Sequence, residues 1–314
     1  MRYFVIGLLL IPLFELGAHA WIVQHVPSPR AYREASAFIR EQLEPRDLIT
    51  AAPAFIDPIV RWQLGDRMPL AMAARNSDTR YTRMWVLSIR GALPKNVPSA
   101  APELSRDFGP VRVLRYRLAQ NDDNLLFDFV ENWENAAGTR TRAGVSEACP
   151  LRTGGFPRGG GLGKAVLMPV RKRLECDART PWFFIAPVVL EGLDNEPHYC
   201  IWQHPMGPEP VTLTYRDVPL GAELWFMGGL YYEHERMREG AAIDATISID
   251  GQPSAQFHHV DGMGFTSIHI PTSALGKTRA TVSVSVQTQD TRGRSFCWAA
   301  ETRSRPLPQT GPAP

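Results

Sequence analysis

Short apolar runs that alternate with polar residues fill the chain after Leu125, and this pattern restricts the fold more than any other feature. The clearest run is TVSVSV at residues 281–286, in which every second residue is a valine. A period of two places these valines on one face of a strand. Asp250-Gly251 is a hairpin-turn signal, and helical periodicity is nearly absent from this region. Many short strands with such turns predict an antiparallel β-sandwich of jelly-roll or immunoglobulin-like type.

The region before the sandwich has a different pattern and predicts a small α/β domain. Apolar residues recur at helical spacing from Ala31 to Leu43, and a second helix is predicted from Phe55 to Leu64, with Pro58 near its first turn. Strand candidates rich in β-branched and aromatic residues cover 47–52, 84–89 and 111–118. We therefore predict an α+β protein.

Two domains are expected, because the length exceeds the ~250 residues at which single cores tend to divide. With a leader and a tail, the chain has four segments. They are a signal peptide or membrane anchor at 1–26, the small α/β domain at 27–122, the sandwich at 123–304 and a Pro-rich disordered tail at 305–314. The stretch 139–173 is polar and glycine-rich. We expect it to form a long loop inserted into the sandwich.

The N-terminus carries a targeting segment. Arg2 is followed by roughly a dozen apolar residues, the length of a signal-peptide core, and Ala18-His19-Ala20 is a cleavage signal. The alternative is an uncleaved anchor, because the apolar stretch resumes at Trp21 and approaches the ~20 residues that a membrane span requires. Both alternatives predict a periplasmic or extracellular location, and the uncleaved form would also be held at the membrane.

The four cysteines are consistent with an oxidising compartment. They are even in number and contain no C-x-x-C pair, which argues against a zinc site or a thioredoxin-like motif. Cys200 and Cys297 each lie in a strand-like aromatic context, so we predict a disulfide between them, and by elimination a second between Cys149 and Cys176. The alternative is four reduced, buried cysteines.

Scattered charge argues against a nucleic-acid partner. The formal charge is +2, and the basic residues are dispersed apart from a triplet at 171–173, whereas a nucleic-acid footprint needs clustered Lys and Arg. The Gly-rich stretch that ends at Lys164 lacks the first glycine and the hydroxyl group of a phosphate-binding loop, because Arg158 and Ala165 stand there. We predict neither nucleic acid nor a cofactor.

No cluster in the sequence has the spacing of a metal or catalytic site. The metal-ligand-like groups are His258-His259 with Asp261, and Glu233-His234-Glu235. Adjacent strand residues point to opposite faces, so we interpret both groups as surface loops and predict no metal. A hydrolase triad would have to combine Ser267 or Ser295 with His198, His204 and Asp217, and no G-x-S-x-G elbow is present. No catalytic residue is predicted.

Aromatic residues concentrate in the predicted sandwich and suggest ligand binding. Exposed aromatic rings can stack on sugar rings, and core packing is the alternative role. We predict that Tyr231 and Tyr232, in the loop after Gly228-Gly229, and Trp225 face a ligand.

Three short segments near the start resemble a family of membrane enzymes. They are ASAFIR at 35–40, PRDLI at 45–49 and Ala52-Pro53, and they are similar to the region after the last membrane helix of glycosyltransferases of the dolichyl-phosphate-mannose mannosyltransferase type. In those enzymes a periplasmic extension often opens with an amphipathic helix and a similar strand. The sandwich, with VPLG at 218–221 and FCW at 296–298, looks like the lectin-like domains that bacteria append to such proteins.

The resemblance implies a partner and not an activity. Those transferases catalyse within a bundle of membrane helices, whereas this chain has at most one candidate span, so no catalytic residue can be carried over. We therefore expect a noncatalytic extracytoplasmic protein that binds a glycan or a partner, such as a multi-span membrane glycosyltransferase, in cell-envelope sugar transfer. The alternatives are a secreted carbohydrate-active hydrolase or transferase with an unrecognised site, and a structural envelope subunit.

Overall fold

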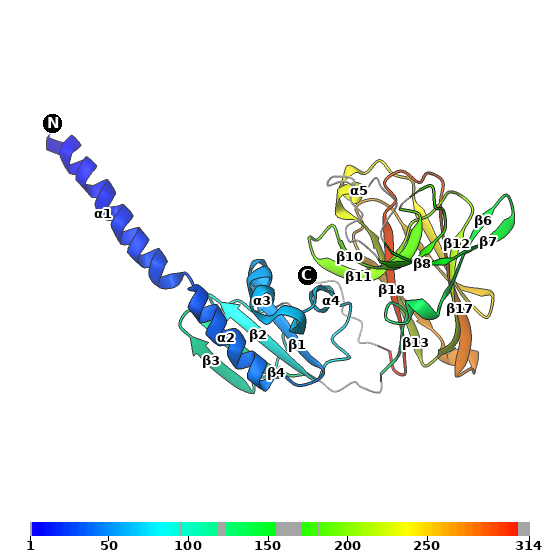
Figure 1. Cartoon of the computed structure of the whole chain (residues 1–314), viewed down its shortest axis with the longest axis horizontal. Coiled ribbons are helices and arrows are strands. Elements are labelled where there is room, and N and C mark those ends of the chain that lie inside the picture. Colours follow the sequence, from blue (N-terminus) through cyan, green and yellow to red (C-terminus); the bar gives the residue numbers. More distant parts are fainter. Residues whose placement is uncertain (1, 95, 119–123, 155–170, 181, 307–314) are drawn as a thin grey trace. The chain divides into compact units, whose positions relative to one another are not determined.

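The computed structural model describes residues 2–94, 96–118, 124–154, 171–180 and 182–306 (Figure 1). The chain divides into two compact units. The first unit contains Met1–Ala73 and Arg80–Gln120, and the second contains Ala74–Thr79 and Asn121–Pro314. Within the described residues, no helix is both long enough and apolar enough to cross a membrane. The first helix, α1, covers Arg2–His25.

Two helices pack on the sheet of the first unit, as the sequence predicts. Helix α2 (Pro29–Gln42) begins at Ser28, whose hydroxyl accepts a hydrogen bond from the Ala31 N–H. Helix α3 (Asp57–Leu64) follows the short 3-10 helix η1 (Ala54–Ile56), with Pro58 in its first turn. Both helices bury one apolar face, because apolar residues recur at helical spacing. Two further short helices follow, η2 (Gly65–Arg67) and α4 (Leu70–Ala73).

The sheet of the first unit has the strand order β1-β2-β4-β3. Strands β1 and β2 are parallel, and the other neighbours are antiparallel. Their bounds are β1 (Asp47–Ala52), β2 (Arg83–Ile89), β3 (Leu104–Phe108) and β4 (Val111–Arg117). The sequence predicts three of these strands and misses β3, an edge strand whose three central residues are exposed.

Two antiparallel sheets form the second unit, which confirms the predicted α+β fold with a sandwich (Figure 1). The β13 sheet has the order β16-β13-β18-β11-β10-β9-β8, with β5 also paired to β18. Its bounds are β5 (Leu125–Asp128), β8 (Leu151–Thr153), β9 (Lys172–Glu175), β10 (Phe184–Glu191), β11 (Pro197–Gln203), β13 (Glu223–Leu230), β16 (Thr266–Pro271) and β18 (Phe296–Arg303).

The second sheet, the β14 sheet, has the order β15-β14-β17-β12-β6-β7. Its bounds are β6 (Ala137–Arg142), β7 (Val145–Cys149), β12 (Val211–Pro219), β14 (Ile243–Ile249), β15 (Gln252–His259) and β17 (Arg279–Thr288). Between strands lie three short helices, η3 (Trp133–Asn135), α5 (Tyr232–Met237) and η4 (Ser273–Leu275). The alternating valines of β17 are buried, as the period of two predicts.

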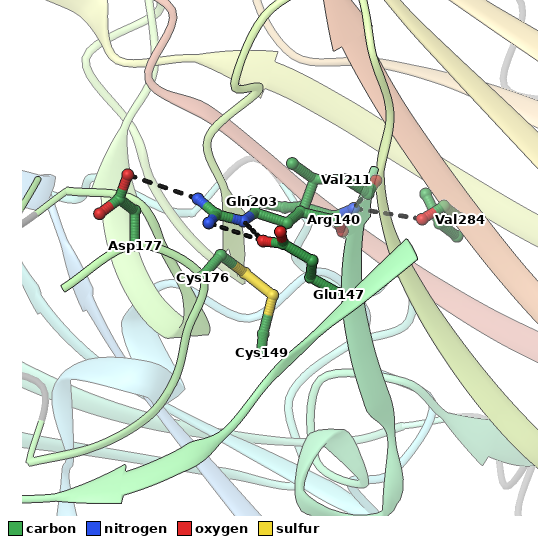
Figure 2. Close-up of a disulfide and its surroundings, with 8 residues drawn as sticks. All are labelled: Arg140, Glu147, Cys149, Cys176, Asp177, Gln203, Val211 and Val284. Atoms are coloured by element: carbon green, nitrogen blue, oxygen red, sulfur yellow. Dashed lines mark hydrogen bonds and ion pairs between the residues drawn. A yellow bond between two sulfur atoms is a disulfide. The ribbon is translucent and has the colours of Figure 1, made fainter. Parts of the chain in front are cut away.

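Aromatic rings and one glutamine fill the space between the sheets. Phe226 stacks on Trp298 with ring centroids 5.5 Å apart, and Phe257 of the opposite sheet lies 5.2 Å from Phe226. The Gln203 side chain donates to the carbonyl oxygens of Val211 and Val284 on the β14 sheet, at 2.8 and 3.1 Å (Figure 2). Its own oxygen accepts from the Trp298 indole N–H at 2.7 Å. The buried amide is therefore fully engaged.

Both disulfides have the pairing expected from the sequence. Cys200 and Cys297 join the neighbouring strands β11 and β18. Cys149 ends β7 in the β14 sheet and Cys176 follows β9 in the β13 sheet, so this bond ties the two sheets together at one edge (Figure 2). Arg140 lies beside it and contacts the carboxylates of Glu147 and Asp177 (Figure 2).

The expectation that 139–173 is one long loop is wrong for the described part of that stretch. Residues 137–149 form the hairpin β6–β7, and β8 and β9 also fall in or across it. The hairpin turns at Ala143 and Gly144, which both have positive φ. Strand β7 is the edge of its sheet, and only Gly138 and Cys149 of the two hairpin strands are buried, so they lack the apolar alternation that marks a half-buried strand. Residues 155–170, and 307–314 of the expected disordered tail, lie outside the described residues.

Candidate ligand-binding site

Three loops meet at one end of the sandwich, which we call the α5 end. They are 231–242 with helix α5, 260–265, and 289–295. The pairing of Leu230 with Phe296 places the first and third loops side by side, because one leaves β13 where the other enters β18. Loops carried on a rigid sandwich are a common place for binding residues. Tyr231 and Tyr232, two of the residues predicted from the sequence to bind a ligand, lie here.

Tyr231 is fixed by the neighbouring loop. Its N–H donates to the Ser295 carbonyl oxygen at 3.2 Å. The hydroxyl of Ser295 is 3.0 Å from His234 Nδ1 on α5. Ser295 therefore holds both the start of α5 and a side chain in its first turn, which orients the aromatic residues around it.

Three rings form an aromatic group at the start of α5. The rings of Tyr231 and Tyr232 meet edge to face with centroids 4.9 Å apart, and His234 meets Tyr231 in the same way at 5.7 Å. The Arg236 guanidinium lies 5.6 Å from the centre of the Tyr232 ring. The Tyr232 hydroxyl donates to Glu233 at 3.3 Å. All three rings are half-buried, so they are held in place and still reach solvent.

Burial favours the neutral forms of Tyr231 and His234. Burial, followed by the negative charge of Glu233, raises the pKa of Tyr231 to about 12. Burial, together with the positive charge of Arg294, lowers the pKa of His234.

A buried ion pair supports the loops from beneath. Arg294 donates to both carboxylate oxygens of Asp261, at 2.7 and 3.2 Å, and to the Ala241 carbonyl at 2.9 Å. Asp261 also accepts the Gly240 N–H at 2.9 Å. The side chains of Arg294 and Asp261 are 2% and 5% exposed. This pair joins all three loops, since each of them contributes a residue.

A second buried contact fixes α5 itself. Glu235, fully buried, accepts the Gly264 N–H at 2.5 Å and lies 3.2 Å from Nε2 of the buried His259. The interpretation of Glu233-His234-Glu235 and His258-His259 as surface loops is thus wrong: the first lies on α5 and the second on β15. As the alternation of a strand requires, His258 faces solvent and pairs with Asp244, whereas His259 faces inward.

Trp225 lies elsewhere on the sandwich. It lies on the opposite face of β13 from Phe226, yet only 7% of it is exposed and it belongs to the buried core of the unit. The Arg303 guanidinium lies 5.1 Å from its ring centre. Tyr231 is six positions after Trp225, just past the end of β13, which corresponds to about 20 Å at the usual rise. The structure therefore brings the two tyrosines together and leaves Trp225 apart.

The α5 end offers binding chemistry more readily than catalysis. Half-exposed rings beside a carboxylate and a guanidinium suit a polar ligand with an apolar face. Ser295 contacts His234 and not the histidines considered from the sequence, and within the described residues no carboxylate is hydrogen-bonded to the other nitrogen of His234. In the same described residues no group of three or more His, Cys, Asp or Glu could hold a metal ion.

Sequence reasoning considered His234 and Asp261 only as members of metal-ligand-like groups, and it did not single out Arg236 or Arg294. His234 and Arg236 adjoin the predicted tyrosines, and a short helix after Tyr231 would have placed them on its surface. The pairing of Arg294 with Asp261 joins residues 33 apart, and no local pattern marks it.

Comparisons with known proteins give weak structural similarities. No protein family matches the chain, and no curated protein matches it. The CBM51 module of Clostridium perfringens GH95, solved with methyl-galactose, has 13% identity and a TM-score of 0.27, covering 37% of this chain and 81% of that one.

Two further solved structures are similar at the same low level. The CBM51-2 and INT domains of Clostridium perfringens ZmpB, solved with GlcNAc, have 11% identity and a TM-score of 0.32, covering 66% of this chain and 39% of that one. An exo-β-1,3-galactanase from Phanerochaete chrysosporium, solved with galactose, has 12% identity and a TM-score of 0.22, covering 62% and 38%. Similarities this low give no information about function. The proposal below is therefore based on the geometry of the site.

Proposed function

We propose that the sandwich is a noncatalytic glycan-binding module whose site is the α5 end. The observation that carries the proposal is the edge-to-face pair of half-exposed rings of Tyr231 and Tyr232. Glu233 accepts from the Tyr232 hydroxyl, and the Arg236 guanidinium lies over the Tyr232 ring. A sugar ring has apolar C–H faces and a rim of hydroxyl groups, so it matches an aromatic platform bordered by hydrogen-bonding side chains.

The support beneath the rings favours binding of a ligand to a preformed surface. Arg294 and Asp261 form a buried ion pair, and the buried Glu235 accepts the Gly264 N–H, so the three loops are braced before any ligand arrives. A site that is already ordered loses less conformational entropy when it binds. Shallow sites for sugars need this advantage, because they bury little area.

We propose an extracytoplasmic location and a role beside a multi-span membrane glycosyltransferase in cell-envelope sugar transfer. Two disulfides and the apolar N-terminal segment support the location. The partner rests on the sequence resemblance near residues 35–53. In this arrangement the module would hold an acceptor glycan near the enzyme.

A glycan array probed with the full chain tests the binding function. We expect binding to a restricted set of glycans, and loss of that binding in Tyr232→Ala. Tyr231→Phe keeps the ring and removes only the hydroxyl, so it should weaken binding less. The matched control is Trp182→Ala, because Trp182 is another exposed aromatic residue of the same unit, 49% exposed.

Two results would contradict the proposal. The first is the absence of binding to any glycan at millimolar ligand, with a folded, disulfide-bonded protein. The second is turnover of a glycoside that depends on Ser295 and His234, which would favour the enzyme alternative.

A further inference from the structure

Helix α3 of the first unit and the 3-10 helix η1 before it present an apolar face to solvent, which we call the α3 face, with Phe55 on η1 and Ile59 and Trp62 on α3. Phe55, Ile59 and Trp62 are 67%, 43% and 85% exposed. Their spacing of four and three residues places them on one side of a helix, one above the other. Single exposed apolar side chains are ordinary, whereas three large ones in a row indicate a surface that something covers.

The opposite face of the same helical segment already forms core. Ile56, Val60 and Leu64 are 1%, 0% and 3% exposed and belong to the cluster beneath α2. The buried row therefore packs the helix onto the unit without any contribution from the outer face. The outer residues are not core residues left unpacked by chance, because the inner row holds the helix in place by itself.

The area of the outer face argues against a stable protein partner or a second copy. An aromatic side chain buries roughly 150–250 Å², so the three residues together would bury roughly 400–600 Å². A specific stable interface needs about 800 Å² from each partner. Contact with a lipid surface does not need a buried area of this size when another segment already holds the protein near that surface.

Charge and chain order favour a membrane surface. The first unit carries 15 Lys and Arg against 9 Asp and Glu, a formal charge of +6, while the second unit has 19 against 23, a charge of −4. Only three residues separate α1 from α2. Helix α1 exposes large apolar side chains of its own, at Ile11, Leu13, Phe14, Leu16, Trp21 and Ile22.

We propose that the α3 face of Phe55, Ile59 and Trp62 lies in the headgroup region of an anionic bilayer. Tryptophan suits this position, because its ring is apolar and its N–H still finds a polar partner at the interface. The basic unit supplies the attraction to anionic lipid, and α1 holds the unit close to the same surface. This proposal is independent of glycan binding by the second unit.

Quenching of tryptophan fluorescence by brominated lipid tests the proposal in the full chain. Vesicles of brominated phosphatidylcholine with 30% phosphatidylglycerol are compared with vesicles that lack the anionic lipid. A local readout is needed, because α1 alone could bring the whole protein to the vesicles. We expect the brominated lipid to quench less tryptophan fluorescence in Trp62→Phe than in the wild type. The difference should be about the contribution of one of the eight tryptophans.

The control is Trp182→Phe, which removes an exposed tryptophan of the acidic unit and should leave the quenched emission unchanged. The double variant Phe55→Ser/Ile59→Ser keeps Trp62 and should lose the same share of quenching as Trp62→Phe. Equal quenching in the wild type and Trp62→Phe would overturn the proposal. So would a change of oligomeric state in Trp62→Ser without vesicles, which would identify a second copy as the occupant.

Discussion

The guanidinium group of Arg294 lies directly against the Cα of Gly240, so closely that a Cβ at Gly240 would be 1.8 Å from the guanidinium carbon. The contact lets Asp261 accept both the Arg294 side chain and the Gly240 N–H. The three loops of the α5 end thus depend on the absence of a side chain at one position.

Gly240→Ala should separate the loops of the α5 end. The new Cβ would displace Arg294 from Asp261 and Ala241, and breaking a buried ion pair costs about 3–5 kcal/mol. We expect a loss of about 3 kcal/mol in the free energy of unfolding, measured by urea denaturation, and weaker ligand binding. Arg292→Ala is the control, since that side chain is 90% exposed and should change stability by less than about 0.5 kcal/mol. Equal stability of Gly240→Ala and wild type would refute the role of this contact.

Acid should destabilise the sandwich through His204. Burial, opposed by the Pro205 carbonyl and assisted by His234 and Arg294, lowers the pKa of His204 from 6.5 to about 4. Above pH 6.5 the ring is neutral in both states and the stability is fully present. Between pH 6.5 and 4 the unfolded chain binds a proton that the folded chain does not, so stability falls by roughly 2–3 kcal/mol.

His204→Asn separates this effect from other titrating groups. Its amide can still donate to the Pro205 carbonyl, as His204 Nδ1 does at 2.8 Å, and it does not titrate. The urea midpoint of the variant should therefore fall less than that of the wild type between pH 7.5 and 4.5. An identical fall in both proteins would exclude His204 as the source.

The two disulfides should contribute unequally to stability. The sequence separations are 97 residues for Cys200–Cys297 and 27 for Cys149–Cys176. Loop-closure entropy predicts about 4.7 and about 3.6 kcal/mol, respectively. Thermal unfolding of the two double Cys→Ser variants should rank them in that order. The reverse order would show that the tie between the sheets at Cys149–Cys176 outweighs the loop length.

Gln203→Leu should destabilise the core although it removes a polar side chain from it. The substitution leaves the Trp298 N–H and two strand carbonyls without their partner, and each unsatisfied buried group costs about 1–3 kcal/mol. We expect a loss of at least about 3 kcal/mol by chemical denaturation. Gln203→Glu gives a second comparison, because it keeps the acceptor for Trp298 and loses the donor. A stabilising effect of Gln203→Leu would contradict the bridge.

Much of the fold could be predicted because its signals are local. Helix α2 has its apolar residues at helical spacing, β1 is a short apolar run, and β17 alternates strictly. The hairpin β6–β7 could not be recognised, because its strands bury only Gly138 and Cys149 and so have no apolar alternation. Helix α5 was missed for a different reason: its sequence YEHERM is polar, and its one buried residue, Glu235, finds its partner on β15.

The candidate site was predictable only where its residues are adjacent in the sequence. Tyr231 and Tyr232 are neighbours, so one loop brings both to the surface. Trp225 was grouped with them by composition, yet the alternation of β13 turns it to the outer face beneath Arg303. Arg294 and Asp261, which brace the loops, come from separate connections and meet only in the folded chain.

Titration calorimetry with the strongest glycan from the array tests the central claim, that Tyr231 and Tyr232 form the binding platform. Tyr232→Ala should weaken binding at least about tenfold, or about 1.4 kcal/mol, while Trp182→Ala binds as the wild type does. Equal affinity of Tyr232→Ala and wild type, in protein that retains both disulfides, would place the ligand elsewhere and contradict the account.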